Sequence, residues 1–190
     1  MRFASLLIFL VFMILVGCKT EQPGTEQTQT VTGEKNKLHY TVPDGWVSEQ
    51  PKSRMRLAQF RLPGQDGAED AELAVFVFPG TGGSVNANLA RWYGQFKQPD
   101  GAASEDKADV KKQKVHDLEV TLVYVTGTYL QSTSPMMMGG PVKEVPSSAM
   151  FAAIVETGTD PWFFKAVGPQ STIDHWRPSF DALVQSFKWE

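Results

Sequence analysis

The side chains of this chain that could transfer protons or bind a metal ion include three histidines, His39, His116 and His175. A metal site needs such groups at ligand spacing, for example HExxH on one helix face, and no two of these histidines have it. His116-Asp117 and Asp174-His175 are adjacent pairs, whose side chains do not face each other for acid–base work. No serine lies in GxSxG, the motif of an exposed nucleophile. The sequence therefore predicts no metal site, no cofactor and no catalytic centre, and it favours a protein that is not an enzyme.

Two further motifs resemble ligand sites only in part. Gly80, Gly82 and Gly83 precede a predicted helix, whose N-terminus could bind an anion. Val85 stands where GxGxxG needs its third glycine, and no Lys-Ser/Thr follows, so we interpret the segment as a tight turn. Met136 to Met138 could offer soft ligands to Cu(I), but they lie between a Ser/Thr-rich stretch and a glycine pair. A loop tip is the simpler interpretation.

A polar stripe along the helix after this turn is the remaining candidate. Four polar residues recur at i, i+4, i+7 and i+11 and so share one line of a helix: Ser84, Asn88, Arg91 and Gln95. Two interpretations stay open. In the first, the groups cap the helix and bond neighbouring loops; in the second, they form a contact patch for a partner. The second interpretation assigns the contacts to Asn88, Arg91, Tyr93 and Gln95, with Arg91 as a planar anchor that has several donors.

Three large aromatic residues, Trp46, Trp162 and Phe164, suggest an alternative site. They would line a space between sheet and helices that holds a small apolar ligand. Aromatic side chains are more often part of a core than of a ligand site, which is the simpler interpretation. The protein would be a carrier if a small molecule co-purifies with it, and a binding module if a stoichiometric protein does.

The elements that would position these residues centre on a strand, a glycine turn and a helix in residues 71–97. Both alternating sets of residues 73–78 are apolar, so this strand should be covered on both faces and lie inside a sheet. Ser84 is a suitable N-cap. An apolar stripe predicts that the helix packs back on the sheet: Val85, Leu89, Trp92 and Phe96.

The rest of the chain alternates strand patterns with turn residues. Strands are predicted over residues 38–42, 54–62, 149–155 and 162–167, and a hairpin over 108–130 turns at His116-Asp117. Hydrophobic residues change parity within 54–62, which predicts a bulge near Ala58-Gln59. Residues 131–146 are predicted as a loop. We interpret the lysines of the first hairpin arm as protection of an exposed sheet edge: Lys107, Lys111, Lys112 and Lys114.

The final segment is predicted to be helical from Ser171. Its apolar stripe consists of Phe180, Leu183, Val184 and Phe187. Pro178 fits best in the first turn of this main helix, because proline lacks the N–H that later helix positions use. Residues 173–176 are therefore predicted to form a short separate turn.

The N-terminus predicts export and lipid anchoring. Arg2 supplies a positive start, and residues 3–16 are an apolar run too short to span a bilayer comfortably. The run ends in Leu15-Val16-Gly17-Cys18, which resembles the bacterial lipobox. The resemblance implies cleavage after Gly17 and acylation of Cys18 with several chains, which hold a protein firmly in a bilayer. Lys19 resembles the outer-membrane sorting signal of Gram-negative lipoproteins.

The chain thus divides into a signal peptide (1–17), a lipidated flexible tether (18–36) and a single α+β domain (37–190). The tether is polar, with Val31 as its lone aliphatic residue, so it cannot bury a core. Cys18 is the only cysteine, which excludes intramolecular disulfides and cysteine-ligated zinc. Removal of Arg2 leaves 17 basic against 21 acidic residues and changes the formal charge from −3 to −4. A mildly acidic domain argues against nucleic acid as a partner.

The order of several short motifs over residues 38–187 resembles the Mog1/PsbP-like superfamily. The motifs are Pro43-Asp44-Gly45-Trp46, Pro79-Gly80, Asn88 with Arg91-Trp92 and Gln95-Phe96, Trp162-Phe163-Phe164-Lys165, and Gly168-Pro169. The resemblance implies an α/β/α sandwich around a mostly antiparallel sheet, and a function in non-enzymatic binding or assembly. Together with the lipobox, it predicts a membrane-anchored envelope lipoprotein with an envelope protein as its partner.

Overall fold

The computed structural model describes residues 37–133 and 140–190. The predicted signal peptide (1–17), the tether (18–36) with Cys18, and the run from Met136 to Met138 lie outside these residues. In the part of the chain that is described, no helix is both long enough and apolar enough to cross a membrane.

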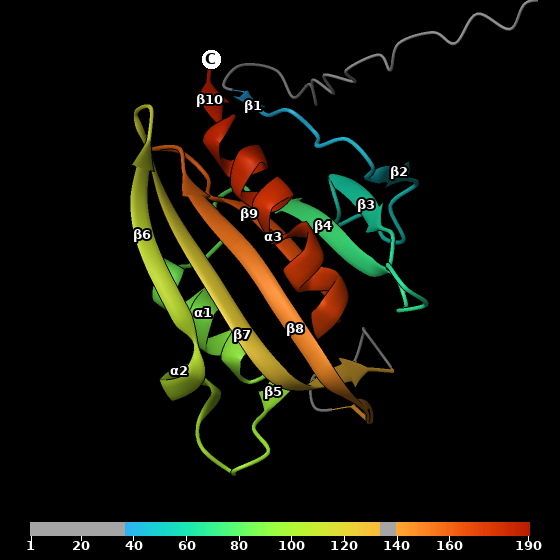
Figure 1. The fold of residues 1–190 in the computed structure, drawn as a ribbon. Coiled ribbons are helices and arrows are strands. Elements are labelled where there is room, and N and C mark those ends of the chain that lie inside the picture. The colour runs from blue at the N-terminus through green and yellow to red at the C-terminus, as the bar shows by residue number, and fades with distance from the viewer. Residues whose placement is uncertain (1–36, 134–139) are drawn as a thin grey trace, which may run out of the picture.

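An antiparallel sheet runs through the centre of the structure (Figure 1). Its strands follow the order β2-β3-β4-β9-β8-β7-β5, in which β5 pairs with residues 128–129 of β7. The strand β6 pairs with residues 118–124 of β7. The strand bounds are β2 Val47–Glu49, β3 Ala58–Leu62, β4 Ala71–Val77, β5 Phe96–Lys97, β6 Asp109–Val115, β7 Leu118–Ser132, β8 Val142–Glu156 and β9 Trp162–Pro169. A separate two-stranded sheet joins β1 (Leu38–His39) to β10 (Lys188–Trp189).

Helices cover both faces of the main sheet. The helix α3 (Gln170–Gln185) lies across one face, and α1 (Val85–Tyr93) and the short α2 (Ser104–Lys107) lie against the other (Figure 1). Successive residues of β8 point to opposite faces, so Phe151 joins the core under α3, while Met150 and Ile154 join the core under α1. The predicted α+β fold, an α/β/α sandwich around an antiparallel sheet, is confirmed.

The unit of strand, turn and helix in residues 71–97 has the predicted place. β4 lies inside the sheet, paired with β3 on one side and β9 on the other. Leu73 and Val75 are completely buried in the core under α3. Ser84 caps α1, and its hydroxyl oxygen accepts a hydrogen bond from the backbone N–H of Ala87 at 3.2 Å.

Three element boundaries in the first half of the domain differ from the prediction. β1 ends at His39, so residues 40–42 do not continue the strand as predicted. The helix α1 ends at Tyr93, because Gly94 follows it and Phe96 pairs with Tyr129 in the sheet. β3 starts at Ala58, and much of the stretch before it forms turns and bends. The predicted strand over 54–57 is therefore wrong, and the change of parity needs no bulge. Met55 is 65% exposed, so its apolar side chain does not mark a buried strand face.

The hairpin of β6 and β7 turns at His116-Asp117 as predicted, with a positive φ of 51° at His116. Within the described chain β6 pairs with β7 alone, so Lys111, Lys112 and Lys114 line a sheet edge as predicted. Lys107 does not, because it lies at the end of α2 and pairs with Asp100. The next hairpin is longer than predicted, because β7 and β8 continue to pair as far as Ser132 and Val142. Much of the loop predicted over 131–146 is therefore strand.

The helix α3 is continuous from Gln170 to Gln185, so residues 173–176 do not form the predicted separate turn. Pro178 lies in its interior, where a proline costs about 3 kcal/mol in an isolated helix. Tertiary contacts on both sides of Pro178 offset this cost. Ile173 and Phe180 are buried in the same core, and the indole N–H of Trp176 donates to the carbonyl oxygen of Pro63 at 2.8 Å.

Candidate functional site

Asn88, in the middle of the polar stripe of α1, is a buried supporting residue with 3% of its surface exposed. Its Nδ2 donates to the carbonyl oxygens of Gly82 at 2.7 Å and Ser84 at 3.0 Å. Its Oδ1 accepts a hydrogen bond from Nη2 of Arg91 at 2.6 Å. Asn88 therefore holds the glycine turn against the helix and positions Arg91, while offering almost no surface of its own to a partner.

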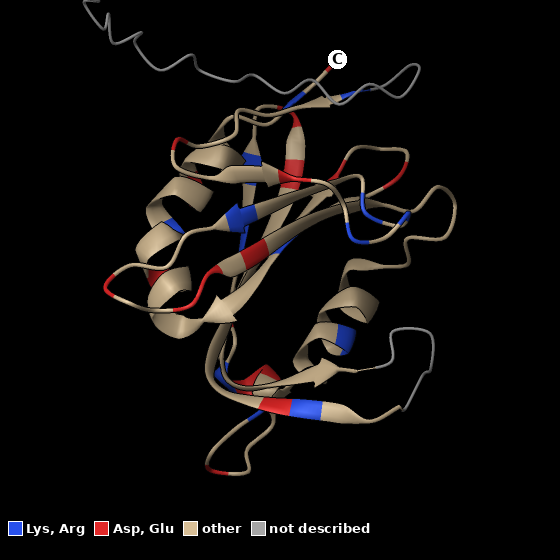
Figure 2. Ribbon diagram, turned by 90° about the vertical axis from the view of Figure 1, so that its right-hand side faces the viewer, with Lys and Arg blue, Asp and Glu red and all other residues tan. Residues whose placement is uncertain are grey.

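Arg91 is exposed on the last turn of α1. The sequence of α1, VNANLARWY, has Arg91 as its one basic residue and no acidic residue; Figure 2 colours basic residues blue and acidic residues red. Across residues 37–133 and 140–190, Arg91 makes no ion pair, and its one hydrogen bond is the bond to Asn88. A guanidinium has five N–H donors, so Arg91 keeps donors free for a ligand.

Gln95 binds a residue that the sequence prediction did not single out. Its Oε1 accepts a hydrogen bond from Nζ of Lys165, which lies in β9. Lys165 alternates with Trp162 and Phe164 of the α3 side and so shares the α1 side of β9 with Phe163. Its neighbours on the two adjacent strands are both alanines, whose short side chains leave room for a long one.

The surroundings of the Lys165 amine are aromatic and positively charged. Nζ lies 6.0 Å from the ring centre of Trp92 and 5.8 Å from that of Tyr129. Burial, followed by the positive charges of Arg91 and Arg56, lowers the pKa of Lys165 to about 7. Among the described residues, no carboxylate lies within ion-pairing distance of this amine. Near neutral pH the amine is therefore about half protonated, without a counter-ion in the described part of the chain.

Two basic residues that precede β3, Arg56 and Lys52, already share the carboxylate of Glu72 in β4. Nη1 of Arg56 lies 2.6 Å from Oε1 of Glu72, and Nζ of Lys52 lies 2.5 Å from Oε2. Burial raises the pKa of Glu72, but hydrogen bonds from Lys52 and Arg56 outweigh burial and hold that pKa below its usual value. Glu72 is thus charged and committed to two cations. It is not free to neutralise Lys165.

Tyr93, the remaining residue of the predicted patch, is half-buried at the end of α1 and packs against the core on that side. Burial raises the pKa of its hydroxyl, and the charge of Glu105 in α2 acts in the same direction. The structure therefore brings Arg91 and Gln95 together around Lys165. Asn88 supports Arg91 by accepting a hydrogen bond from its guanidinium. Tyr93 lies on the side toward α2.

Trp46, Trp162 and Phe164, the residues of the carrier alternative, are core residues with 8%, 7% and 0% of their surface exposed. Trp46 packs against Phe60 at 6.1 Å between ring centres, and Phe164 packs against Phe187 at 4.8 Å. None of the three lines either of the cavities described below. These residues give the carrier alternative no support beyond their composition.

The three histidines have separate surroundings. Nε2 of His39 lies 3.7 Å from Oε2 of Glu190, and Nδ1 of His116 is 3.0 Å from the carbonyl oxygen of Phe187. His175 is exposed on α3. No group of three or more His, Cys, Asp or Glu in the described residues is arranged to hold a metal ion.

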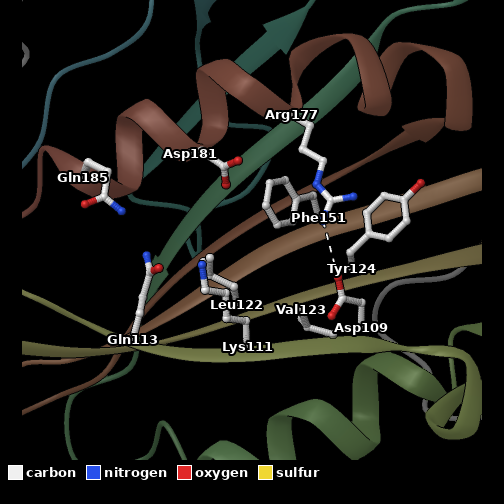
Figure 3. A pocket seen from close by; sticks show the side chains of 10 residues that line it. All are labelled: Asp109, Lys111, Gln113, Leu122, Val123, Tyr124, Phe151, Arg177, Asp181 and Gln185. Atoms are coloured by element: carbon white, nitrogen blue, oxygen red, sulfur yellow. Dashed lines mark hydrogen bonds and ion pairs between the residues drawn. The ribbon is translucent and has the colours of Figure 1, made fainter.

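A cavity of about 320 Å³ lies between α3 and the strands β6 and β7 (Figure 3). Its charged lining consists of Asp109 and Lys111 from β6 and Arg177 and Asp181 from α3. Nη2 of Arg177 lies 3.4 Å from Oδ2 of Asp109, and its guanidinium lies 4.6 Å from the ring centre of Tyr124. Two acids face two bases in this lining, so the cavity offers no net charge to a ligand.

A more open cavity of about 530 Å³ lies between the start of α1 and residues 156–161. The carboxylate of Asp160 accepts a hydrogen bond from the backbone N–H of Gly80 at 2.7 Å. Ser84 accepts from the N–H of Ala87. The protein's own oxygens thus satisfy N–H groups of the glycine turn, as expected for a tight turn and a helix cap.

No protein-family model matches the chain, and a comparison with curated proteins finds no match. Among solved structures, the chain is similar to cyanobacterial PsbP (CyanoP) from Synechocystis sp. PCC 6803, at 15% sequence identity and a TM-score of 0.51, over 93% of this chain and 99% of that chain. It also matches a protein of unknown function, PA94 from Pseudomonas aeruginosa, at 14% identity and a TM-score of 0.43, over 80% of this chain and 95% of that one. The α/β/α sandwich and the likeness to CyanoP show a PsbP-like fold.

Proposed function

We propose that this protein is an envelope lipoprotein that acts as a non-enzymatic protein-binding or assembly module. The Leu15-Val16-Gly17-Cys18 sequence supports an anchor in which acylated Cys18 holds the mature chain in the bilayer. Lys19 favours the outer membrane if the host is Gram-negative. Residues 18–36 would then be a tether that lets the folded part reach an envelope protein.

The observation that best supports a binding role is the pair of basic side chains, Arg91 and Lys165, on the α1 face. Neither makes an ion pair within residues 37–133 and 140–190, and the charge of Arg91 bears on Lys165. Unpaired charge near a partly buried amine costs stability, and a partner of opposite charge would offset that cost. Arginine is also enriched among the residues that dominate protein interfaces.

The lipid anchor is tested by growing cells with a labelled fatty acid such as palmitate. The wild-type protein should carry the label, and the Cys18→Ala variant should not. Label retained in the variant would remove Cys18 from the proposal.

The binding role is tested by crosslinking in the living envelope, followed by recovery of the full-length protein from solubilised membranes. We compare the wild type with Arg91→Ala and with Lys114→Ala, which removes an exposed basic residue from the edge strand β6. Wild type and Lys114→Ala should recover the same stoichiometric protein, and Arg91→Ala should recover about tenfold less of it. Equal recovery by all three, with the fold intact by circular dichroism, would exclude the α1 face as the contact.

Two measurements separate this proposal from the other classes of function. Native mass spectrometry of the protein from its natural host would reveal a co-purifying small molecule if the protein is a carrier. A broad panel of esterase and phosphatase substrates would show turnover if it is a hydrolase. We expect a bound protein in the first measurement and no turnover in the second.

A further inference from the structure

Lys165 and Arg91 have more hydrogen-bond donors than the protein satisfies. A protonated lysine has three N–H donors, and Gln95 is the one acceptor of Lys165 in the described chain. Arg91 has five donors and bonds Asn88 alone there. Burial lowers the pKa of Lys165, and the positive charge of Arg91 lowers it further. In the described chain, the space beside Lys165 and Arg91 therefore lacks an acceptor that carries negative charge.

Glu72 and Glu49, two acids in the same half of the sheet, cannot supply that acceptor, because their oxygens are already bound. Glu72 is shared by Arg56 and Lys52. Glu49 lies 3.3 Å from Arg61 and accepts a hydrogen bond from the side chain of Gln59 at 2.9 Å. Within residues 37–133 and 140–190, therefore, neither acid is left to supply the negative group.

The residues around the Lys165 amine favour one kind of anion. The rings of Trp92 and Tyr129 flank the Lys165 amine, so part of the lining is apolar. A doubly charged phosphate loses more hydration in such surroundings than a singly charged carboxylate. A planar carboxylate also matches the fork of donors on an arginine, which can bind both oxygens at once.

We propose that Lys165 and Arg91 form a binding site for a carboxylate group beside the end of α1. Lys165 supplies a positive charge from the sheet, and Arg91 supplies paired donors from the helix. The inference deepens the proposed function and rests on it, because Arg91 is also the anchor of the proposed protein contact. The carboxylate belongs to a free small acid or to an acidic side chain of the partner, and the experiment below separates these sources.

Binding at this site has a proton signature. At pH 8 the free Lys165 amine is mostly neutral, since its pKa is about 7. A bound carboxylate favours the charged amine and raises that pKa again, so binding takes up close to one proton per ligand. The other groups that face the amine do not add protons at this pH. Arg91 and Arg56 are already charged, Glu72 stays ionised with a lowered pKa, and burial raises the pKa of Tyr129 so that it stays neutral.

The experiment uses the full-length protein in non-ionic detergent at pH 8, at constant ionic strength and in weak buffer. The two probes are butyrate, as a free acid with an apolar stem, and a capped peptide of five glutamates, as an acidic protein segment. Calorimetry measures binding, and a pH-stat measures proton uptake. The wild type should bind at least one probe and take up about one proton per bound carboxylate.

Three variants distinguish the carboxylate site from general attraction. Lys165→Met should weaken binding about tenfold and abolish proton uptake. Lys165→Arg should retain binding without proton uptake, because arginine is charged at every pH used. Lys114→Met, on the edge strand, should match the wild type in both measurements. Equal affinity in Lys165→Met, or undiminished proton uptake in Lys165→Arg, overturns the proposal, provided that circular dichroism shows both variants folded.

The outcomes also separate this proposal from the protein-binding function. Binding of the peptide alone assigns the carboxylate to a protein segment, and binding of butyrate with similar affinity assigns it to a free acid. If neither probe binds the wild type, the carboxylate site is overturned. An Arg91-dependent partner recovered in the crosslinking experiment would then still support the binding module.

Discussion

The amine of Lys165 in β9 donates a hydrogen bond to the side-chain oxygen of Gln95, 70 residues earlier in the chain. This bond links the residue that follows α1 and Gly94 to the middle of the main sheet. It places a basic group beside two aromatic rings and close to a second basic group, without a counter-ion in the described chain. The consequences for stability can be measured.

The first prediction is that Lys165→Met stabilises the protein at low pH and not at high pH. The pKa of Lys165 falls from its usual 10.5 in the unfolded chain to about 7 in the folded one. Between these values the unfolded chain holds a proton that the folded chain has lost, so wild-type stability rises with pH. Below pH 7 both states are protonated, and the fold carries the full cost of the buried charge.

Urea unfolding at pH 6, 8 and 9.5 measures this effect. At pH 6 the variant should be more stable than the wild type by on the order of 1–3 kcal/mol, and the gain should shrink as the pH rises toward 10. The exposed control Lys114→Met should change stability by less than about 0.5 kcal/mol at every pH. A constant difference between Lys165→Met and wild type over the whole range would contradict the prediction.

The second prediction concerns two asparagines of α1. Asn88→Ala removes the hydrogen bonds to Gly82 and Ser84 and the support of Arg91, and should cost about 1–3 kcal/mol of the free energy of unfolding. Asn86→Ala changes an exposed residue of the same helix and should stay within about 0.5 kcal/mol. Equal losses in chemical denaturation would show that Asn88 has no special supporting role.

The third prediction follows from the indole N–H of Trp46, which is buried and finds no hydrogen-bond acceptor among the residues that the structure describes. Trp46→Phe removes this unpaired donor and should cost less than about 1.5 kcal/mol. Trp46→Ala leaves a large cavity beside Phe60 and Phe180 and should cost about 3–5 kcal/mol. Thermal unfolding measures both. A loss of stability in Trp46→Phe as large as in Trp46→Ala would argue that the indole N–H does have a partner.

The fourth prediction compares the same substitution at two glycines. A Cβ at Gly168 would lie 2.4 Å from Cβ and 2.6 Å from Cα of Ala71, so Gly168→Ala must displace the neighbouring strand. It should lower the free energy of unfolding by about 1–3 kcal/mol. Gly94 has a helical φ of −63°, and a Cβ there would meet only contacts of 3.6 Å or more. Gly94→Ala should raise stability by about 0.4–1 kcal/mol, because alanine restricts the unfolded chain. Scanning calorimetry should show shifts of opposite sign, and shifts of one sign would contradict this account.

Much of the fold could be predicted because neighbouring residues carry the information. The two apolar faces of β4 place it inside the sheet, Ser84 marks the start of α1, and His116-Asp117 marks a hairpin turn. Where local patterns conflict with distant contacts, the prediction is wrong. Pro178 is typical of a helix start, yet it lies inside α3, because buried residues on both sides stabilise one continuous helix.

The candidate site was predictable only in part. The helical spacing of Asn88, Arg91 and Gln95 marks one face of α1, but it does not separate the buried supporting residue from the exposed one. The sequence does mark Lys165 as unusual. It is a charged residue in an otherwise apolar strand, and it lies on the same strand face as Phe163. Its acceptor, Gln95, and its aromatic neighbours, Trp92 and Tyr129, lie in segments far away in the sequence.

The sequence by itself determined the central place of β4, the start of α1, the turn at His116-Asp117 and the apolar faces that pack, because these depend on side chains a few positions apart. Only the tertiary structure decided that Arg91, Gln95 and Lys165 meet at one place and that the Lys165 amine loses its usual affinity for protons. The reason is that desolvation and charge repulsion depend on distances in space, and those distances are set by how remote segments pack together.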